Sequence, residues 1–210
     1  MNINAPRDYS IIAPVYDQIF NKILSEGHRE IGLLLKDRSK DKKLKVLEVG
    51  MGSGLTLNYL PKKINYTGID INERMLELAK EKTKETKFIQ TSLSLMDAKK
   101  LQFKSGTFDF VIAASVVTAV DDPQKTIEEM IRVTKKNGHI AIIANMRNKN
   151  SIKSGLLKYL DPLTKMLFGF RMDLEADFFD KFKKIELTNH RPINFVAGRP
   201  LSSFLIFKRK

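Results

Sequence analysis

The sequence has no cysteine among its 210 residues. Disulfide bonds, thiolate metal sites and a cysteine nucleophile are therefore excluded, and this composition suits a reducing compartment. Long apolar runs are also missing, because the longest, Val111 to Val120, has about half the length that a membrane-spanning helix needs. The first ten residues show no apolar run behind a basic region, so we expect no signal peptide. These absences predict a cytoplasmic chain that is soluble or rests on a surface.

The sequence also lacks internal repeats and low-complexity linkers. With 42% hydrophobic residues, a chain of this length can bury most of its apolar surface around one core. We therefore expect a single domain.

Acidic residues are in deficit, with 24 Asp and Glu against 37 Lys and Arg, which gives a formal net charge of +13. Such an excess favours anionic partners such as nucleic acid, phospholipid or phosphorylated metabolites. A lysine-rich solvated surface explains the same total, so both explanations stay open.

Short apolar runs typical of strands alternate with amphipathic runs typical of helices. This alternation predicts an α/β fold in which a mainly parallel sheet is covered by helices on both faces. Two late runs, separated by a connection over 191–200, predict an antiparallel pair at one sheet edge. Pro123 after two aspartates marks a helix start, and Asn137-Gly138 is expected to end that helix. The expected strands cover 45–49, 66–70, 87–90, 108–114, 139–145, 184–188 and 201–207, and the expected helices cover 15–36, 55–60, 73–84, 123–134 and 151–168.

The most informative motif joins a buried strand to three alternating glycines, in the run Val46-Leu47-Glu48-Val49-Gly50-Met51-Gly52-Ser53-Gly54. Glycines let the backbone turn sharply and approach a ligand, and the N-terminus of a following helix offers free N–H groups. Asp70 ends the next expected strand, 20 positions after Gly50. This spacing suits a carboxylate that holds the two hydroxyls of a ribose.

The residues around the glycines separate the ligand classes that use such a loop. A dinucleotide fingerprint would place Gly or Ala where this chain has Leu55. Glu48 fits a ligand with an ammonium group better than one with a pyrophosphate. A Walker loop is excluded because no Gly-Lys-Ser/Thr follows. The glycines could also form a tight turn that binds no ligand, and the position of Asp70 argues against this alternative.

The run Glu48-x-Gly50-x-Gly52-x-Gly54 resembles motif I of the class I S-adenosylmethionine-dependent methyltransferases. Residues 67–76, 96–103, 108–112 and 132–139 resemble later motifs of the same family, so the resemblance covers most of 8–146. It implies a Rossmann-like fold with a mainly parallel seven-stranded sheet and an antiparallel C-terminal edge. It also implies S-adenosylmethionine as cofactor, S-adenosylhomocysteine as product, and no metal. The cofactor-binding residues that it implies are Glu48, Gly50, Met51, Gly52, Ser53, Gly54, Asp70, Ile71, Met75, Asp97, Ala98, Ala114 and Ser115.

A finer resemblance points to the bacterial phospholipid N-methyltransferases, which convert phosphatidylethanolamine toward phosphatidylcholine. The residues that carry it are Tyr9-Ser10-Ile11-Ile12-Ala13-Pro14-Val15-Tyr16-Asp17, Val116 to Pro123, Asn145 with the basic stretch after it, Leu160-Asp161-Pro162-Leu163, Arg191-Pro192 and Leu205-Ile206-Phe207. The Ala-Pro-x-Tyr-Asp element also occurs in quinone-ring C-methyltransferases. A quinone-ring or other small-molecule methyltransferase is therefore the alternative.

For an ethanolamine acceptor, Tyr9 and Tyr16 are the candidate catalytic residues, and we expect them to position the cofactor or headgroup. Arg191 and Arg199 would hold the phosphate. The amine must lose a proton before it attacks, and the sequence shows no obvious pairing of His with a carboxylate. Desolvation beside the sulfonium would then lower the pKa of the ammonium group. The histidines His28, His139 and His190 are expected at the surface or at strand ends.

Residues 147–171 contain six basic side chains and one acidic one, interleaved with bulky apolar residues. This pattern suits a helix in an anionic membrane interface, and it also suits a core-packing helix with a solvated basic face. A phospholipid substrate and an anionic membrane surface are the expected partners. Nucleic acid is not expected, because no base-clamping motif of the Asn-Pro-Pro-Tyr type is present. A cofactor-binding scaffold without turnover is the non-enzymatic alternative.

These patterns divide the expected single domain into four parts. Residues 1–40 would form a helical cap over the site, 44–146 the cofactor-binding core, 147–182 a basic amphipathic insertion, and 183–210 the C-terminal strand pair.

Overall fold

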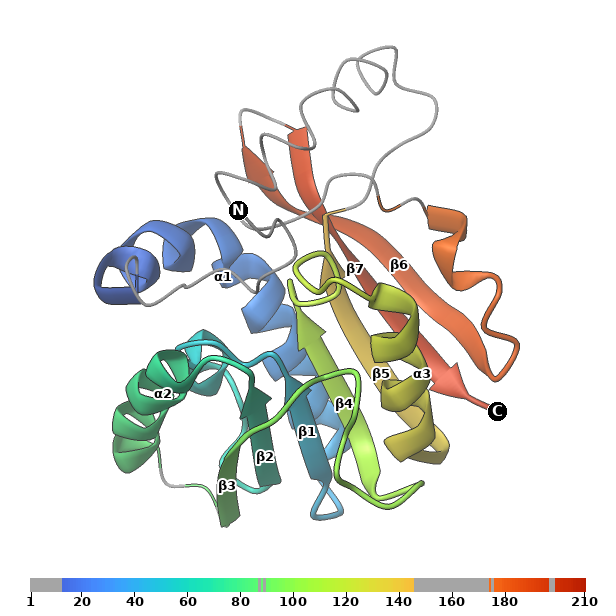
Figure 1. Cartoon of the computed structure of the whole chain (residues 1–210), viewed down its shortest axis with the longest axis horizontal. Helices are drawn as coiled ribbons and strands as arrows, with labels where there is room; N and C mark the ends of the chain where they lie inside the picture. The colour runs from blue at the N-terminus through green and yellow to red at the C-terminus, as the bar shows by residue number, and fades with distance from the viewer. Residues whose placement is uncertain (1–12, 87, 89, 146–173, 175, 197–198) are drawn as a thin grey trace.

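A computed structural model describes residues 13–86, 88, 90–145, 174, 176–196 and 199–210. Its centre is one seven-stranded sheet with the order β3-β2-β1-β4-β5-β7-β6 (Figure 1). Only β7 runs antiparallel to its neighbours, β5 and β6, and the other pairs are parallel. The expected α/β fold with an antiparallel C-terminal edge is therefore confirmed. The strands are β1 (Lys45–Val49), β2 (Asn65–Asp70), β3 (Gln90–Leu95), β4 (Phe108–Ala114), β5 (Thr134–Ala144), β6 (Ile185–Val196) and β7 (Arg199–Arg209).

Helices cover both faces of the sheet. Helices α1 (Ala13–Arg38) and α2 (Glu73–Glu85) pack on one face, where Ile31, Leu35 and Leu76 enter a common cluster with the sheet. Helix α3 (Pro123–Val133) and the short 3-10 helix η2 (Ala176–Phe179) cover the other face. A second short 3-10 helix, η1 (Leu55–Asn58), follows β1.

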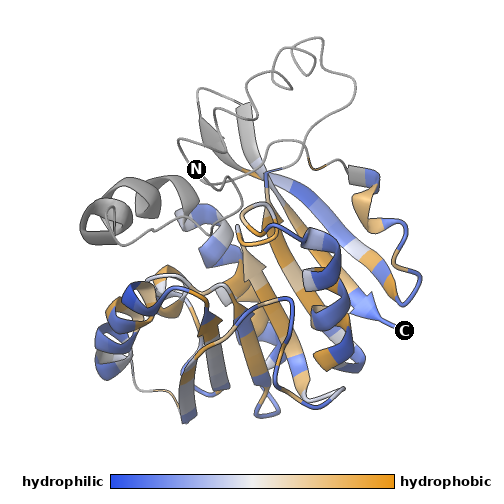
Figure 2. Cartoon of the chain, viewed as in Figure 1, coloured by the Kyte–Doolittle hydropathy of each residue, from blue (hydrophilic) through white to orange (hydrophobic). Residues whose placement is uncertain are grey.

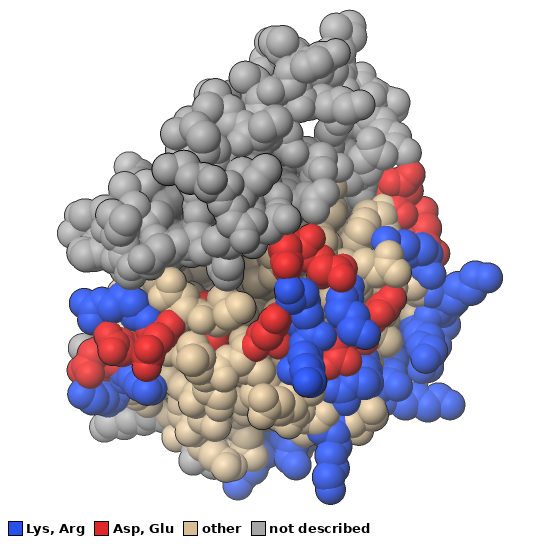
Figure 3. Space-filling model, in the orientation of Figure 1, with Lys and Arg blue, Asp and Glu red and all other residues tan. Residues whose placement is uncertain are grey.

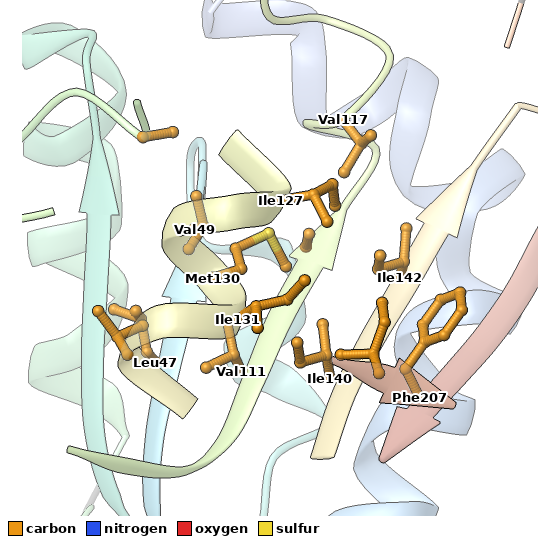
Figure 4. Close-up of a cluster of buried hydrophobic side chains, with 14 of the residues drawn as sticks. Leu47, Val49, Val111, Val117, Ile127, Met130, Ile131, Ile140, Ile142 and Phe207 are labelled. Atoms are coloured by element: carbon orange, nitrogen blue, oxygen red, sulfur yellow. The ribbon is translucent and has the colours of Figure 1, made fainter. Parts of the chain in front are cut away.

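The central strands are apolar on both faces because helices cover both. Figure 2 shows apolar residues concentrated in these strands and hydrophilic residues on the outer surfaces of α2 and α3. Ile127 and Met130 of α3 point toward Val111 and Ile140 of the sheet, and all four side chains are at most 1% exposed (Figure 4). Strands buried in this way read as continuous apolar runs. The bounds of β1 and β4 match the sequence prediction for the same reason.

The third strand was predicted over 87–90, which is wrong, since β3 covers Gln90–Leu95. Its sequence, QTSLSL, is largely polar and none of its residues is buried. Pairing with β2 on one side, rather than an apolar pattern, makes this segment a strand. The helix predicted over 55–60 is only the single turn η1, because Pro61 disfavours helical conformation at the residue before it.

Helix α3 begins as predicted. The Asp122 side chain accepts a hydrogen bond from the Lys125 backbone N–H (2.9 Å), and Pro123 takes the first helical position. The helix ends at Val133, one residue before the predicted end at 134, and β5 starts directly after it. Asn137-Gly138 therefore lies within β5 and is not what ends the helix. Asn137 has a positive φ of 61° within an irregular start of β5.

The late strands are longer than predicted. Most of the connection expected over 191–200 belongs to strands, since β6 continues to Val196 and β7 starts at Arg199. Pro192 is tolerated because β6 is the outer strand of the sheet and pairs only with β7.

Several predictions fall outside the described residues. They are the helix over 151–168 and nearly all of the basic insertion. No helix in the described part of the chain is long and apolar enough to cross a membrane. The four-part division of the domain stays a prediction.

Candidate active site

The glycine loop and the loops after β2 and β4 lie at the carboxyl ends of three adjacent strands. In the sheet, β1 stands between β2 and β4, and the chain order reverses at that point (Figure 1). The crevice at such a switch point is where open α/β sheets bind their ligands.

The three glycines of the loop all have positive φ, at 64° for Gly50, 56° for Gly52 and 80° for Gly54. They differ in their surroundings. A Cβ on Gly50 would lie 2.3 Å from Cγ2 of Val116, whereas a Cβ on Gly52 would meet nothing within 4 Å. Gly50 is thus required by packing, while Gly52 borders open space. A ligand can lie directly against the backbone there.

Asp70 ties the glycine loop to the loop after β2. Its Oδ2 accepts a hydrogen bond from the Gly52 N–H (2.8 Å) and its Oδ1 accepts one from the Asn72 N–H (2.9 Å). Burial raises the pKa of Asp70, and the backbone donors oppose that rise. Each carboxylate oxygen keeps a further lone pair for a ligand hydroxyl. Ile71, next in the chain, is 53% exposed and offers an apolar surface beside this carboxylate.

The loop after β3 lies beside the loop after β2. The Met96 N–H donates to the Asp70 carbonyl oxygen (2.9 Å), which places Asp97 and Ala98 beside the Asp70 loop. Asp97 is partly exposed and its Oδ1 accepts from the Lys99 N–H (2.8 Å). Asp70, Ile71 and Asp97 are thus brought together although they are far apart in sequence.

The loop after β4 completes the crevice. Ser115 has a positive φ of 65°, an uncommon conformation for a residue other than glycine, and its N–H donates to the Ile143 carbonyl oxygen (2.8 Å). This conformation turns the chain sharply at the carboxyl end of β4. Backbone strain of this kind is often found at ligand sites.

Comparisons with known proteins agree on one family. A family model described as "Methyltransferase domain" matches residues 47–142. Demethylmenaquinone methyltransferase of Staphylococcus aureus (strain MRSA252) is 32% identical over 183 residues, which are 85% of this chain and 72% of that protein. The chain belongs to the S-adenosylmethionine-dependent methyltransferases.

Two further similarities have wider coverage. Phosphatidylethanolamine N-methyltransferase of Cereibacter sphaeroides is 29% identical to this methyltransferase over 197 residues, which are 93% of each chain. A solved SAM-dependent methyltransferase from Aquifex aeolicus superposes with a TM-score of 0.64 at 19% identity, over 96% of this chain and 98% of that one. At that identity the superposition shows the fold.

The described residues of this methyltransferase fit S-adenosylmethionine. Open space beside Gly52 adjoins the carboxylate of Asp70, and the loops that carry Ile71 and Asp97 lie next to it. The contacts of these residues with the ribose and the adenine stay predictions. The described part of the chain contains no group of three or more His, Cys, Asp or Glu residues that could hold a metal ion. The absence of a metal from the reaction stays a prediction.

Glu48 lies in β1, as predicted, but its side chain is buried. Its side chain is 1% exposed, and its two oxygens accept hydrogen bonds from Thr56 Oγ1 (2.7 Å) and the Tyr66 hydroxyl (2.6 Å). Burial is the main cause that raises the pKa of Glu48 to about 7. Both carboxylate oxygens therefore have partners within the protein, and contact of Glu48 with the ligand's ammonium group stays a prediction. Glu48 fastens η1 and β2 beneath the glycine loop.

Three other predicted cofactor residues have buried side chains. Met51 is 4% exposed and lies against Gly68, Ser53 is 1% exposed, and Met75 is 3% exposed. The Ser53 hydroxyl accepts a hydrogen bond from Lys82 Nζ (3.5 Å). Any contact of these residues with the cofactor would have to come mainly from their backbone.

The predicted acceptor-side residues are described only in part. Tyr9 lies outside the described residues, and so do the side chains of Tyr16 and Arg199. Arg191 is described: its guanidinium forms an ion pair with Glu30 of α1 and lies 5.7 Å from the Phe204 ring centre. It is therefore not a free cation, and phosphate binding would have to compete with Glu30.

Sequence reasoning misplaced His28. It was expected at the surface or at a strand end, but it lies within α1, is 5% exposed and sits 6.2 Å from the Tyr59 ring. Burial, with a smaller contribution from Lys82, lowers the pKa of His28 to about 4. The helical spacing of His28, Ile31 and Leu35 is the signal that could have shown its burial. His190 is exposed, as expected, with Nε2 3.1 Å from Ser203 Oγ.

Proposed function

We propose that this methyltransferase methylates the amine of phosphatidylethanolamine, in the direction of phosphatidylcholine, at a membrane surface. The observation that carries the proposal is the alignment with the Cereibacter sphaeroides phosphatidylethanolamine N-methyltransferase over 93% of both chains. An alignment of this extent continues well beyond residues 47–142, which match the general methyltransferase domain. It therefore includes parts of the N-terminal and C-terminal segments that are proposed to meet the acceptor.

S-adenosylmethionine, when bound, supplies an electrophilic methyl group on a cationic sulfonium. The chain's own contribution is to hold donor and acceptor in line, since methyl transfer needs no covalent enzyme intermediate. The glycine loop and Asp70 would hold the nucleoside and amino acid parts. The sharp turn at Ser115 would place the end of β4 beside the reacting atoms.

The acceptor ammonium must lose a proton before it attacks. The described carboxylates at this edge all have partners or are buried. Asp70 accepts two backbone hydrogen bonds, Asp97 accepts one, and Glu48 is buried behind the loop. Asp121 is bound by Lys99, Asp122 caps α3, and Glu30 is paired with Arg191. None of them is placed as a free base. This supports desolvation beside the sulfonium as the means of deprotonation, because a buried ammonium group has a lowered pKa.

Tyr9, Tyr16, Arg191 and Arg199 stay proposed as the residues that position the headgroup and its phosphate. The basic amphipathic segment over 147–171 is proposed to contact the anionic membrane surface. Each basic side chain near such a surface contributes on the order of 1 kcal/mol to binding.

Radiolabelled S-adenosylmethionine and vesicles test the acceptor directly. The vesicles would contain phosphatidylethanolamine with an anionic lipid, and a parallel set would contain demethylmenaquinone instead. We expect label in mono-, di- or trimethylated phospholipid and little label in the quinone. An Asp70→Asn variant, which weakens the hold on the ribose, serves as the low-activity control.

Label in the quinone alone would replace the phospholipid with the alternative acceptor. That alternative has its own support, because the demethylmenaquinone methyltransferase of Staphylococcus aureus is 32% identical over 85% of this chain. Label in neither acceptor, with S-adenosylhomocysteine and vesicle binding both demonstrated, would reject both membrane acceptors.

A further inference from the structure

A cavity of about 300 Å³ lies at the amino ends of β4 and β5. Residues from the end of α1, the segment before β1 and the starts of β4 and β5 line it, and we call it the amino-edge cavity. The cofactor loops lie at the carboxyl ends of the same strands. Because β4 is seven residues long, the two sites are separated by roughly 20 Å of strand. The amino-edge cavity is therefore not part of the cofactor site.

The lining is strongly cationic. Arg38, Lys42, Lys135 and Lys136 line the cavity, whereas Asp109 is the only carboxylate among the described residues that line it. Asp109 is already satisfied, because its two oxygens accept hydrogen bonds from Lys135 Nζ and the Lys45 N–H, both at 2.9 Å. Within the described part of the chain, Arg38, Lys42 and Lys136 form no salt bridge, although the charge of Arg38 helps to lower the pKa of Asp37 and that of Lys42 helps to lower the pKa of Asp109. Figure 3 shows Lys and Arg side chains gathered along the lower edge of the molecule, where the amino ends of the parallel strands lie.

His139 and Phe110 give the cavity an aromatic wall. Their rings are stacked, with an interplanar angle of 14° and centres 6.1 Å apart. Arg38 Nη1 donates a hydrogen bond to His139 Nδ1 (3.4 Å), which leaves the ring proton on Nε2 as a donor. Burial, followed by the charges of Arg38, Lys208 and Lys42, lowers the pKa of His139 to about 4. Cations from α1, the segment after it and β7 thus converge on this side chain.

A tight turn holds the lysines in place. Asn137 has a positive φ of 61°, and a Cβ on Gly138 would lie 2.8 Å from the Lys135 carbonyl oxygen and 3.0 Å from that of Asp109. Only glycine fits the second position without displacing backbone. The backbone of Lys135 and Lys136, which precede this turn and line the cavity, is therefore held in place by the fold.

We propose that the amino-edge cavity binds the phosphate group of a small soluble molecule. Convergent cations with one satisfied carboxylate favour a multiply charged anion, and a volume of about 300 Å³ is enough for a small phosphate ester. A lipid headgroup offers the same phosphate. A bilayer that presents an acceptor to the carboxyl edge faces away from this cavity, however, so we commit to the soluble source.

Calorimetric titration with inorganic pyrophosphate tests the site without any methyl transfer, so its result is independent of the proposed acceptor. We would compare the full chain with a Lys42→Ala/Lys136→Ala variant, in which two exposed lining residues are removed. A Lys80→Ala/Lys183→Ala variant loses the same charge at exposed positions outside the cavity. We expect the first variant to bind pyrophosphate roughly tenfold more weakly and the second to bind like the wild type. Affinity for S-adenosylhomocysteine should be unchanged in both.

Three results would overturn the proposal. The first is no saturable pyrophosphate binding by the wild type. The second is an equal loss of affinity in both double variants, which would show a diffuse effect of net charge. The third is that the protein binds phosphatidylglycerol vesicles but not pyrophosphate, and that vesicle binding is lost in the Lys42→Ala/Lys136→Ala variant. That result would make the cavity a membrane contact.

Discussion

At the scale of single residues, the glycines of the loop are needed for two different reasons, packing within the fold and space for a ligand. The motif alone does not show which reason applies to which glycine. Gly50 has no room for a Cβ because Val116 packs against it, and Gly52 has free space beside it. A side chain added at Gly52 therefore tests ligand binding without a clash inside the protein, whereas one added at Gly50 does not.

We therefore expect Gly52→Ala to weaken S-adenosylhomocysteine binding by at least about tenfold, because the new methyl group occupies ligand space. Its positive φ should also reduce stability by about 1 kcal/mol. Gly106→Ala is the matched control, since Gly106 has a φ of 65° and its nearest contact would be at 3.9 Å. Calorimetric titration and thermal melting should show equal losses of stability and a loss of affinity in Gly52→Ala alone. Equal affinities would contradict a ligand beside Gly52.

Glu48 should make the stability of the protein depend on pH. Its pKa is raised from an ordinary value of 4.5 to about 7, so the native state binds the proton more tightly than the unfolded state. This contribution is fully present below pH 4.5 and is lost as the pH rises toward 7.

Relative to Glu48→Gln, the wild type should lose on the order of 2 kcal/mol of unfolding free energy between about pH 4.5 and pH 7. Urea denaturation of both proteins across this range measures the difference. The buried His28 acts with the opposite sign, because its lowered pKa favours the native state as the pH rises, but it is present in both proteins and cancels. A constant difference between the two proteins would show that the pKa of Glu48 is not raised in the native state.

At the scale of elements, α1 is held against β6 by the ion pair between Glu30 and Arg191. Arg191 pairs with Phe204 in the sheet register, and Phe204 pairs with Ile143 near the carboxyl end of β5. The ion pair therefore lies at the same edge as the candidate active site. It connects the N-terminal helix to the late strands, the two parts of the chain proposed to meet the acceptor.

Substitution on each side of this ion pair separates the two roles of Arg191. If it binds the phosphate, Arg191→Gln should raise the KM for phosphatidylethanolamine vesicles about tenfold, since a charge-assisted hydrogen bond is lost. Glu30→Gln, which frees the guanidinium, should leave that KM unchanged or lower it. Equal rises in both variants would show that the pair serves only to fix α1, an effect of at most about 1 kcal/mol at this exposure.

At the scale of the whole molecule, the sheet separates two edges with different chemistry. The carboxyl edge carries glycines, a carboxylate and an exposed isoleucine around the cofactor crevice, and the amino edge carries four cations and one carboxylate around a cavity. The net charge of +13 is therefore not only a solvated surface, because part of it converges on one place. A membrane acceptor at one edge and a soluble anion at the other could bind at the same time.

The sequence by itself determined what depends on local patterns. Strands β1 and β4 are buried on both faces, so their apolar runs predicted their bounds, and the glycine spacing with Asp70 predicted the cofactor crevice. Asp122 with Pro123 predicted the start of α3 because a helix cap acts within one turn.

Tertiary structure decided whatever depends on distant neighbours. The polar strand β3 exists because β2 pairs with it, and β6 and β7 extend through prolines because they pair with each other at the sheet edge. The burial of Glu48 and His28 follows from helices and strands that pack around them. The amino-edge cavity likewise gathers cations from segments up to about 100 positions apart, as with Arg38 and His139. Spacing along the chain cannot show such groupings, because they arise only when the sheet brings its strands into register.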